Sequence, residues 1–280
     1  PRTQVTSAGF SVESSRLGGL SAQDIIGQSG GNAFVNQVVR NGAGLEWLSV
    51  SQINIKPGTL GFPDGKVRKT TGTLTWSFAN PTGPLGLDTG SEAASTWYFL
   101  YAIPDPMDDT RFSVIGSIQT PTEIGGAGPS GYAVSRYVGA IRNDASSNIQ
   151  RFHQSKNRFY WTVLSYLEFN GGHADYTLHD ITLTYVPATA SAGFFFAQLN
   201  KYGQPANWNV HQSFYVRGET AYYFEQDLVR IDYDVDDASF EMPLPGQAPK
   251  VVRHSSSTDN NANQIGGQLL YTTGWEDGAL

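Results

Sequence analysis

Polar and apolar residues alternate along much of the chain with the period of two that is typical of β-strands. In residues 73–78 the alternation places Leu74, Trp76 and Phe78 on one face and hydroxyl side chains on the other. Residues 181–185 repeat the pattern with isoleucine, leucine and tyrosine on the apolar side. Each segment therefore predicts a strand with one buried face and one face in water.

A second pattern marks residues 97–103, WYFLYAI, which are apolar at nearly every position. Such a strand must be covered on both faces, by a second sheet or by a neighbouring subunit. Further strand-like runs occur at residues 112–118, 132–141, 159–167, 194–199, 208–216, 221–235 and 268–272. Turn-forming pairs such as Pro57-Gly58 and Asp64-Gly65 separate the runs. Together they predict an all-β fold, an antiparallel β-sandwich or jelly roll, with an extended N-terminal arm and one short helix.

The N-terminal residues lack this strand pattern. Residues 1–31 are rich in Ser, Gly and Gln with little periodicity, which predicts an extended arm. A helix of about nine residues is expected to follow, too short to be stable without a partner. Its defining residues are the cap Asn32, the i,i+4 pairs Phe34/Val38 and Val35/Val39, and the terminating Gly42. We therefore expect an N-terminal arm and attachment helix over residues 1–44 and one β domain over residues 45–280.

Composition excludes several kinds of function. The 280 residues include no cysteine, which removes disulfides, thiolate metal sites and cysteine nucleophiles. A formal net charge of -7 argues against nucleic acid as a partner, because such proteins need a basic surface to bind phosphates. No run approaches the roughly 20 apolar residues that span a bilayer, and the N-terminus lacks the apolar core of a secretory signal. We expect synthesis in a cytoplasm and no membrane insertion.

Two motifs resemble catalytic or metal sites without their usual context. Gly27, Ser29 and Gly31 match the G-x-S-x-G pattern of serine hydrolases, which requires a buried strand before it and a helix after it. Only the helix is predicted, so we interpret this segment as part of a flexible arm. His173 and His179 stand six residues apart, which fits neither a helical nor a strand pair of zinc ligands. Asp175 and Asp180 lie near them, and His153, His211 and His254 are isolated.

An acidic run forms a third candidate. Asp232, Asp234 and Asp236 alternate along a predicted strand and so share one face. Three carboxylates could hold a hard cation such as Ca²⁺, but the EF-hand pattern fails, because Asp237 and Pro243 stand where glycine and glutamate are required. A solvated acidic face that deters edge pairing is the favoured interpretation, and an intersubunit cation is the alternative.

Carbohydrate chemistry is a further possibility that no motif specifies. Glycoside hydrolysis needs two carboxylates at a set separation, which sequence spacing does not give. The candidate carboxylates are Glu168, Glu219, Glu225 and Glu241. Trp208 and the run Tyr222, Tyr223 and Phe224 could form a sugar-stacking platform, although core packing and subunit contact are the default. No catalytic, cofactor-binding or metal-binding residue is therefore assigned.

Residues 87–161 carry a resemblance to a known class of proteins. They read LDTGSEAASTWYFLYAI, then PSGY, RYVGAIRND and QRFHQSKNRFYW, in that order. This order resembles a segment of tailed-bacteriophage virion proteins described as tail fibre, tail or structural proteins, and it covers roughly a quarter of the chain. The residues that carry the resemblance are Asp88, Gly90, Trp97, Tyr98, Tyr101, Gly131, Tyr132, Gly139 and Arg142. The resemblance implies structural roles for them and no catalysis.

Two classes of function follow from the resemblance. The first is a non-enzymatic virion structural protein on the surface of a tail or capsid, either a tail fibre or adhesion component or a capsid decoration protein. The alternative is a carbohydrate-binding or carbohydrate-degrading tailspike-like protein. The expected partners are other copies of the chain, as a homotrimer, other virion proteins and a host-surface glycan. No cofactor is expected, and the expected location is the virion.

Overall fold

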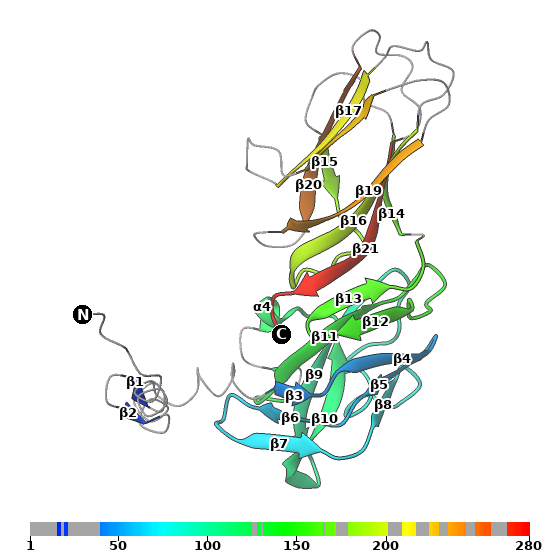
Figure 1. Ribbon diagram of the computed structural model, residues 1–280. Coiled ribbons are helices and arrows are strands. Elements are labelled where there is room, and N and C mark those ends of the chain that lie inside the picture. The colour runs from blue at the N-terminus through cyan, green and yellow to red at the C-terminus, as the bar shows by residue number, and fades with distance from the viewer. Residues whose placement is uncertain are drawn as a thin grey trace, which may run out of the picture.

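The computed structural model of the chain describes residues 16–17, 20–21, 40–124, 128–129, 131–164, 166–171, 179–200, 209–216, 224–229, 235–244, 250–258 and 268–280 (Figure 1). The protein is nearly all β, so the predicted fold class is confirmed. The helical residues that are described form no segment with the length and hydropathy of a membrane span.

The strands occur in the following order along the chain. They are β1 (Arg16–Leu17), β2 (Leu20–Ser21), β3 (Arg40–Gly42), β4 (Leu45–Ser49), β5 (Gln52–Ile55), β6 (Gly58–Gly61), β7 (Val67–Thr70), β8 (Leu74–Ser77), β9 (Trp97–Asp105), β10 (Asp108–Ser117), β11 (Arg136–Arg142), β12 (Phe152–Ser155), β13 (Arg158–Trp161), β14 (Leu167–Gly171), β15 (His179–Thr182), β16 (Ala190–Asn200), β17 (Asn209–Val216), β18 (Phe224–Val229), β19 (Val235–Pro243), β20 (Val251–Thr258) and β21 (Gln268–Asp277). The helix α4 (Pro121–Ile124) lies between β10 and β11.

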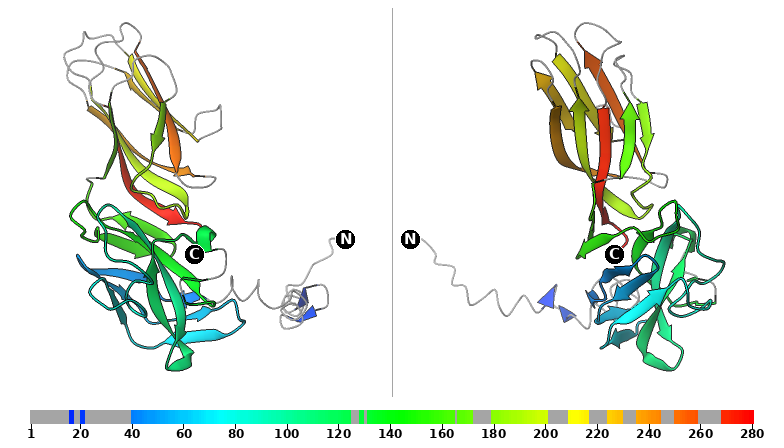
Figure 2. Two further views of the ribbon diagram at one scale, coloured as in Figure 1. Left: turned by 180° about the vertical axis from the view of Figure 1, so that it is seen from behind. Right: turned by 90° about the vertical axis from the view of Figure 1, so that its right-hand side faces the viewer.

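The strands form four main sheets. Their orders are β11-β9-β10-β7-β6-β3, β4-β5-β8, β12-β13-β21-β16-β19 with β14 on β21, and β15-β20-β17-β18. Pairing between the described strands is antiparallel, as predicted, except that β7 and β10 pair in parallel at Lys69 and Arg111. Figures 1 and 2 show β3 to β11 gathered at one end of the molecule and β15, β17, β18 and β20 at the other.

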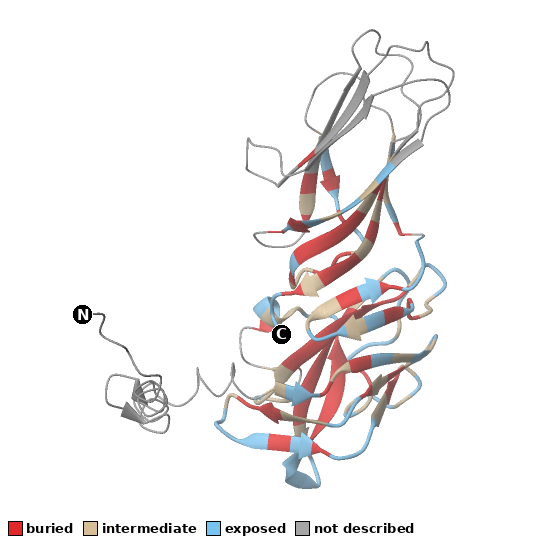
Figure 3. Cartoon of the chain, in the orientation of Figure 1, coloured by how far each residue is buried: buried red, intermediate tan, exposed pale blue. Residues whose placement is uncertain are grey.

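Strand β9 is buried on both faces, as its sequence predicts. Leu100 belongs to the large core that the sheets enclose, whereas Tyr101 belongs to a second apolar cluster on the opposite side of the strand. Ile124 of α4 and Tyr137 of β11 are members of this second cluster. Both coverings therefore come from the chain itself, and β9 is buried over most of its length (Figure 3).

The alternating segments bury their apolar faces as predicted, but β15 ends at Thr182, and Ser77, which was predicted to face water, is buried. Trp76 of β8 is fully buried, and Leu74 and Phe78 pack against the same core. Ile181 and Leu183 are buried, whereas the threonines between and after them are exposed. The period of two in the sequence thus corresponds to the two faces of each sheet.

The helix predicted near the N-terminus is wrong at its C-terminal end. Arg40–Gly42 is strand β3, which pairs with β6, so the six-stranded sheet begins within the predicted arm. Gly42 does adopt a left-handed φ of +77°, but at a bend between β3 and β4, where a Cβ would lie 2.3 Å from the Pro57 carbonyl oxygen. The helix residues Phe34, Val35, Val38 and Val39 lie outside the described residues.

A different short helix, α4, is present where the sequence pattern predicts none. Thr120 and Glu123 form a capping box around its start. The Glu123 N–H donates to Thr120 Oγ1 at 3.2 Å, and the Thr120 N–H donates to Glu123 Oε2 at 2.7 Å. These reciprocal bonds satisfy two backbone donors that the short helix leaves free.

Residues 40–61 form one long bent hairpin that joins two sheets. β3 pairs with β6 in the six-stranded sheet, and β4 pairs with β5 in the three-stranded sheet. Hydrogen bonds from the Ala43 N–H to the Pro57 carbonyl and from the Lys56 N–H to the Gly44 carbonyl continue the pairing through the bend. The outer side of this hairpin, along residues 40–49, bounds the site described next.

Candidate functional site

The aromatic residues of the phage-like segment are packed into the fold. Tyr98 and Tyr101 point to opposite sides of β9 and are almost fully buried. The Tyr98 hydroxyl accepts a hydrogen bond from the Ala93 N–H at 2.6 Å, and the Tyr101 hydroxyl donates to the Gln119 carbonyl at 2.7 Å. Trp97, on the same strand, contacts two other tryptophan rings. These side chains fix loops to the core.

Gly139 and Arg142 of β11 also serve packing. Gly139 lies at an irregularity in the β9–β11 pairing, and a Cβ there would lie 2.7 Å from Leu45 Cδ1 and 3.1 Å from Phe159 Cζ. The Arg142 guanidinium is buried over the Tyr185 ring, 4.5 Å from its centroid, and its Nε has no hydrogen-bond partner. The glycine thus permits a close approach of elements that a side chain would prevent.

The remaining residues of the phage-like segment occupy turns or their flanks. The buried Asp88 accepts a hydrogen bond from the Thr89 N–H at 2.7 Å. Gly90 and Gly131 have left-handed φ values of +75° and +84°, which favour glycine. Tyr132 is half-buried and packs against the second apolar cluster. None of these positions presents a nucleophile or a general base to solvent.

Glu168 is a buried carboxylate with a structural set of partners. It accepts hydrogen bonds from the Thr184 N–H at 2.7 Å, the Tyr185 N–H at 2.9 Å and the Thr272 hydroxyl at 2.6 Å. Burial raises the pKa of Glu168, and these bonds oppose the shift. Glu241 is exposed and pairs with Arg158 at 3.2 Å. The same Arg158 nitrogen also pairs with Glu276 at 2.9 Å, so one guanidinium bridges the two carboxylates.

The candidate metal residues are only partly described. His179 of β15 stands directly opposite His254 of β20, a proximity that the sequence spacing did not reveal. Within the described ranges, no three His, Asp or Glu side chains are grouped as metal ligands. Asp237 is exposed. The candidates outside the described residues are Gly27, Ser29, Gly31, His173, Asp175, Trp208, Glu219, Tyr222, Tyr223, Asp232 and Asp234.

A buried polar cluster joins the C-terminal strand to β11. The Tyr137 hydroxyl donates to Asp277 Oδ2 at 2.5 Å, and the Thr189 hydroxyl donates to the same oxygen at 3.1 Å. The Ala279 N–H donates to Asp277 Oδ1 at 3.1 Å. Burial raises the pKa of Asp277 to about 6, although these bonds and the charge of Arg40 favour the carboxylate. Burial likewise raises the pKa of Tyr137, and the neighbouring Asp277 raises it further.

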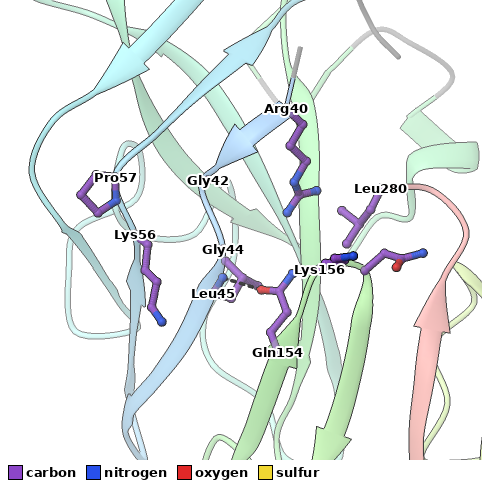
Figure 4. Close-up of a pocket in the computed structure, with 10 residues that line it drawn as sticks. Arg40, Gly42, Gly44, Leu45, Lys56, Pro57, Gln154, Lys156 and Leu280 are labelled. Carbon is purple, nitrogen blue, oxygen red and sulfur yellow. Dashed lines mark hydrogen bonds between the residues drawn. The ribbon is translucent and has the colours of Figure 1, made fainter. Parts of the chain in front are cut away.

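Two pockets line the outer side of residues 40–49 and a third adjoins them at Leu280, and we call the three together the basic trough. The largest has a volume of about 550 Å³, and its neighbours have volumes of about 510 and 240 Å³. They share lining residues, namely Leu280 between the first two and Leu45, Lys56 and Gln154 between the first and third. In Figure 4, Arg40 and Lys156 extend toward the pocket beside Leu280, and Lys56 lies across from them.

The lining of the basic trough is strongly cationic. Its cationic side chains are Arg40, Lys56, Arg136, Arg151 and Lys156, and its single carboxylate side chain is Glu46. This contrasts with the net charge of -7 for the whole chain. The trough leaves no signal in the sequence, because these five residues are scattered along the chain and form no motif.

Of these five cations only Lys56 forms an ion pair among the described residues, although the charge of Asp277 acts on Arg40. Arg40 donates through Nη2 to the Val138 carbonyl at 3.2 Å, but its Nη1 is buried with no hydrogen-bond partner. Lys156 is exposed, and its ammonium has no ion pair. By contrast, Lys56 pairs with Glu46 at 3.6 Å, and Arg151 lies over the Trp47 ring, 5.2 Å from the centroid. The trough can therefore bind an anion.

Among known proteins, only solved structures are similar to this chain. No family model matches the chain, and no curated protein matches it. The structure of the infectious bursal disease virus VP2 subviral particle is similar at 11% identity, with 90% of this chain and 76% of that chain covered and a TM-score of 0.25. The T=1 particles derived from infectious bursal virus have the same identity and TM-score and are covered to 75%. These neighbours are viral capsid proteins, and at this TM-score the likeness establishes neither a shared fold nor a shared function.

Proposed function

We propose that the chain is a non-enzymatic structural component of a bacteriophage virion, carried on the surface of the tail or capsid. The observation that carries the proposal is the use of residues 87–161, the segment that resembles phage virion proteins. Its aromatic residues fill both sides of β9 and fasten the adjoining loops. A segment used in this way supplies a rigid scaffold. A particle component needs such a scaffold, whereas catalysis does not by itself require one.

We further propose that copies of the chain form a homo-oligomer, with a trimer as the expected state, and that the N-terminal arm attaches it to the particle. In support, the arm joins the fold at β3, which is the outermost strand of its sheet. An arm that leaves from a sheet edge can extend away from the fold without disturbing the core. Residues 1–39 are also low in charge and rich in small residues, a composition suited to ordering on a partner.

The test is the composition of purified particles from the phage that encodes the chain. Quantitative mass spectrometry should find the chain in particles banded on a density gradient, and gold-labelled antibody should locate it on their surface. Copy numbers in the hundreds would indicate capsid decoration, and about a dozen would indicate a tail position. Presence only in the soluble fraction of the lysate would refute the structural role. Cleavage of host polysaccharide by the purified chain would replace it with the enzymatic alternative.

A further inference from the structure

The basic trough presents side chains, and not free strand edges, to a ligand. β4 and β12 contact each other where they bound it, and the Leu45 N–H donates to the side-chain oxygen of Gln154 at 2.5 Å. The amide nitrogen of Gln154 donates in turn to the Lys156 carbonyl at 2.7 Å. Because these groups are already paired, a peptide has no edge here to which it can add as a further strand. A ligand of the trough must therefore be recognised by the side chains that line it.

Three of the lining cations are exposed to solvent, namely Lys56, Arg151 and Lys156. Lys156 forms no ion pair with any described residue, and Arg151 contacts the Trp47 ring but no described carboxylate. Lys56 pairs with Glu46 at 3.6 Å, but both side chains are more than half exposed. Such surface pairs contribute little to stability. All three cations are therefore available to an anionic ligand.

Arg40, by contrast, is committed to the interior of the protein. Its Nη2 donates to the Val138 carbonyl at 3.2 Å. Its charge acts on the buried carboxylate of Asp277. Attraction for a ligand in the trough thus comes from the exposed cations, and Arg40 is not counted among the groups that bind it.

The backbone of Lys156 adopts an unusual conformation. This residue lies in the turn between β12 and β13 with a φ of +57°, in the left-handed region that residues other than glycine, asparagine and aspartate seldom adopt. Strained backbone of this kind is concentrated at functional sites, including sites that hold ligands. The turn thus places in the lining a lysine whose ammonium no described carboxylate neutralises.

The exposed cations are spread along the trough. Arg151 and Lys156 stand directly before and after β12, so five steps of about 3.3 Å separate their backbones by roughly 16 Å. Arg151 lines one pocket and Lys156 another, and the two pockets share Lys56. A single small anion would have to draw these side chains together at one point. A linear polymer with spaced acidic groups can meet each cation where it stands.

We propose that the basic trough binds an acidic polysaccharide. The net charge of -7 opposes nucleic acid, because its closely spaced phosphates would be repelled by the rest of the surface. An acidic polysaccharide separates its charges by neutral sugar hydroxyls, and the exposed His153 and Thr162 in the same lining can form hydrogen bonds with hydroxyls. This inference rests on the proposed position at the surface of a virion and names a partner for that surface.

The experiment measures binding of the full-length chain to three immobilised polysaccharides by biolayer interferometry. Polygalacturonate carries carboxylates, dextran sulfate carries sulfates, and neutral dextran is the blank. The trough variant is Arg151→Glu with Lys156→Glu, which changes two exposed side chains. The control is Lys69→Glu with Arg111→Glu, two exposed cations on β7 and β10 that do not line the trough. Both variants make the same change in net charge.

We expect wild type to bind at least one acidic polysaccharide at about 0.05 M salt and to lose it as salt rises toward about 0.5 M, since salt screens exposed charges. Neutral dextran should not bind. The trough variant should lose at least about tenfold in affinity, whereas the control should stay within about twofold of wild type. The probe that binds identifies the acidic group as carboxylate or sulfate.

A second measurement uses wild type and does not depend on the folding of a variant. The bound polysaccharide should protect Lys56 and Lys156 from acetylation, as read by peptide mass spectrometry, and should leave Lys69 as reactive as in the free chain. Equal protection of all three lysines would mean that the polymer coats the surface without using the trough.

Three results would overturn the inference: no binding to either acidic polysaccharide, an equal loss of affinity in the control and the trough variant, or equal protection of the three lysines. Tighter binding of single-stranded DNA, with the same two lysines protected, would assign the trough to nucleic acid instead. Presence in purified particles without polysaccharide binding would reject this inference and leave the virion role standing. Polysaccharide binding by a chain that is absent from particles would reject the proposed function alone.

Discussion

The buried carboxyl group of Asp277 should make the stability of this protein fall as pH rises from acid to neutral. The residue is 1% exposed, and burial raises its pKa from 3.8 to about 6 in the folded chain. In the unfolded chain the group is solvated and titrates near its ordinary value of about 3.9. The folded state therefore holds the Asp277 proton more tightly than the unfolded state does.

The sign and size of the effect follow from this difference. Stability from a group with a raised folded pKa is fully present below its unfolded pKa, here about pH 4, and is lost as pH rises through about 6. A shift of about two units at about 1.4 kcal/mol each corresponds to about 3 kcal/mol of unfolding free energy. That loss is a substantial part of the 5–15 kcal/mol typical of a folded domain.

The variant Asp277→Asn isolates this contribution, because asparagine has nearly the same shape and does not titrate. We expect its unfolding free energy, measured by urea titration of tryptophan fluorescence, to gain on wild type by about 3 kcal/mol between pH 4 and pH 7.5. Altered hydrogen bonds to Tyr137 change the unfolding free energy of the variant by the same amount at each pH. This change therefore cancels when the two pH values are compared. Asp237→Asn, at an exposed position of β19, is the matched control. A difference between Asp277→Asn and wild type that stays constant with pH would refute the reasoning.

Three further outcomes are expected. Leu100→Asp buries an unpaired carboxylate at a cost comparable with the total stability, so it should abolish soluble expression while Leu100→Met does not; a folded Leu100→Asp chain with the wild-type melting temperature would contradict this. Gly116→Ala would put a Cβ 2.6 Å from Cζ2 of Trp76 and should lower the unfolding free energy, measured by urea titration, by about 1–3 kcal/mol. An unchanged unfolding free energy would mean that the Trp76 ring can move aside without cost. Removal of residues 1–39 should leave the melting temperature unchanged but prevent incorporation into particles, and normal incorporation would assign attachment to the β fold.

Local patterns in the sequence predicted local structure well. Alternation at Leu74, Trp76 and Phe78 and the apolar run of β9 each describe one strand and its surroundings, so a short window contains the information. The C-terminal end of the helix predicted near residue 40 is wrong because i,i+4 apolar pairs ignore the sheet edge that captures Arg40–Gly42. The sequence contains the capping-box residues of α4, Thr120 and Glu123. The helix was not predicted from them, because it is only a single turn.

The candidate site could not be predicted in the same way. Arg40, Arg136 and Lys156 each look like ordinary surface cations in the sequence, and only the order of strands in the sheets brings them together. The facing pair of His179 and His254 is a second example, because their proximity depends on the register of β15 and β20. Contacts between residues a hundred positions apart leave no periodic signal in one sequence.

The position of β21 has a consequence for how the protein is made. This strand lies at the centre of its sheet, between β13 and β16, yet the ribosome synthesises it after every strand with which it pairs. Until Gln268–Asp277 emerges, one edge of β16 stays open, and the ring of Trp275 is missing from its stack with Phe159. Until then, the nascent chain exposes an unpaired apolar strand edge. Nascent chains on the same messenger RNA can aggregate through such edges. This sheet can therefore complete its core only after β21 has left the ribosome.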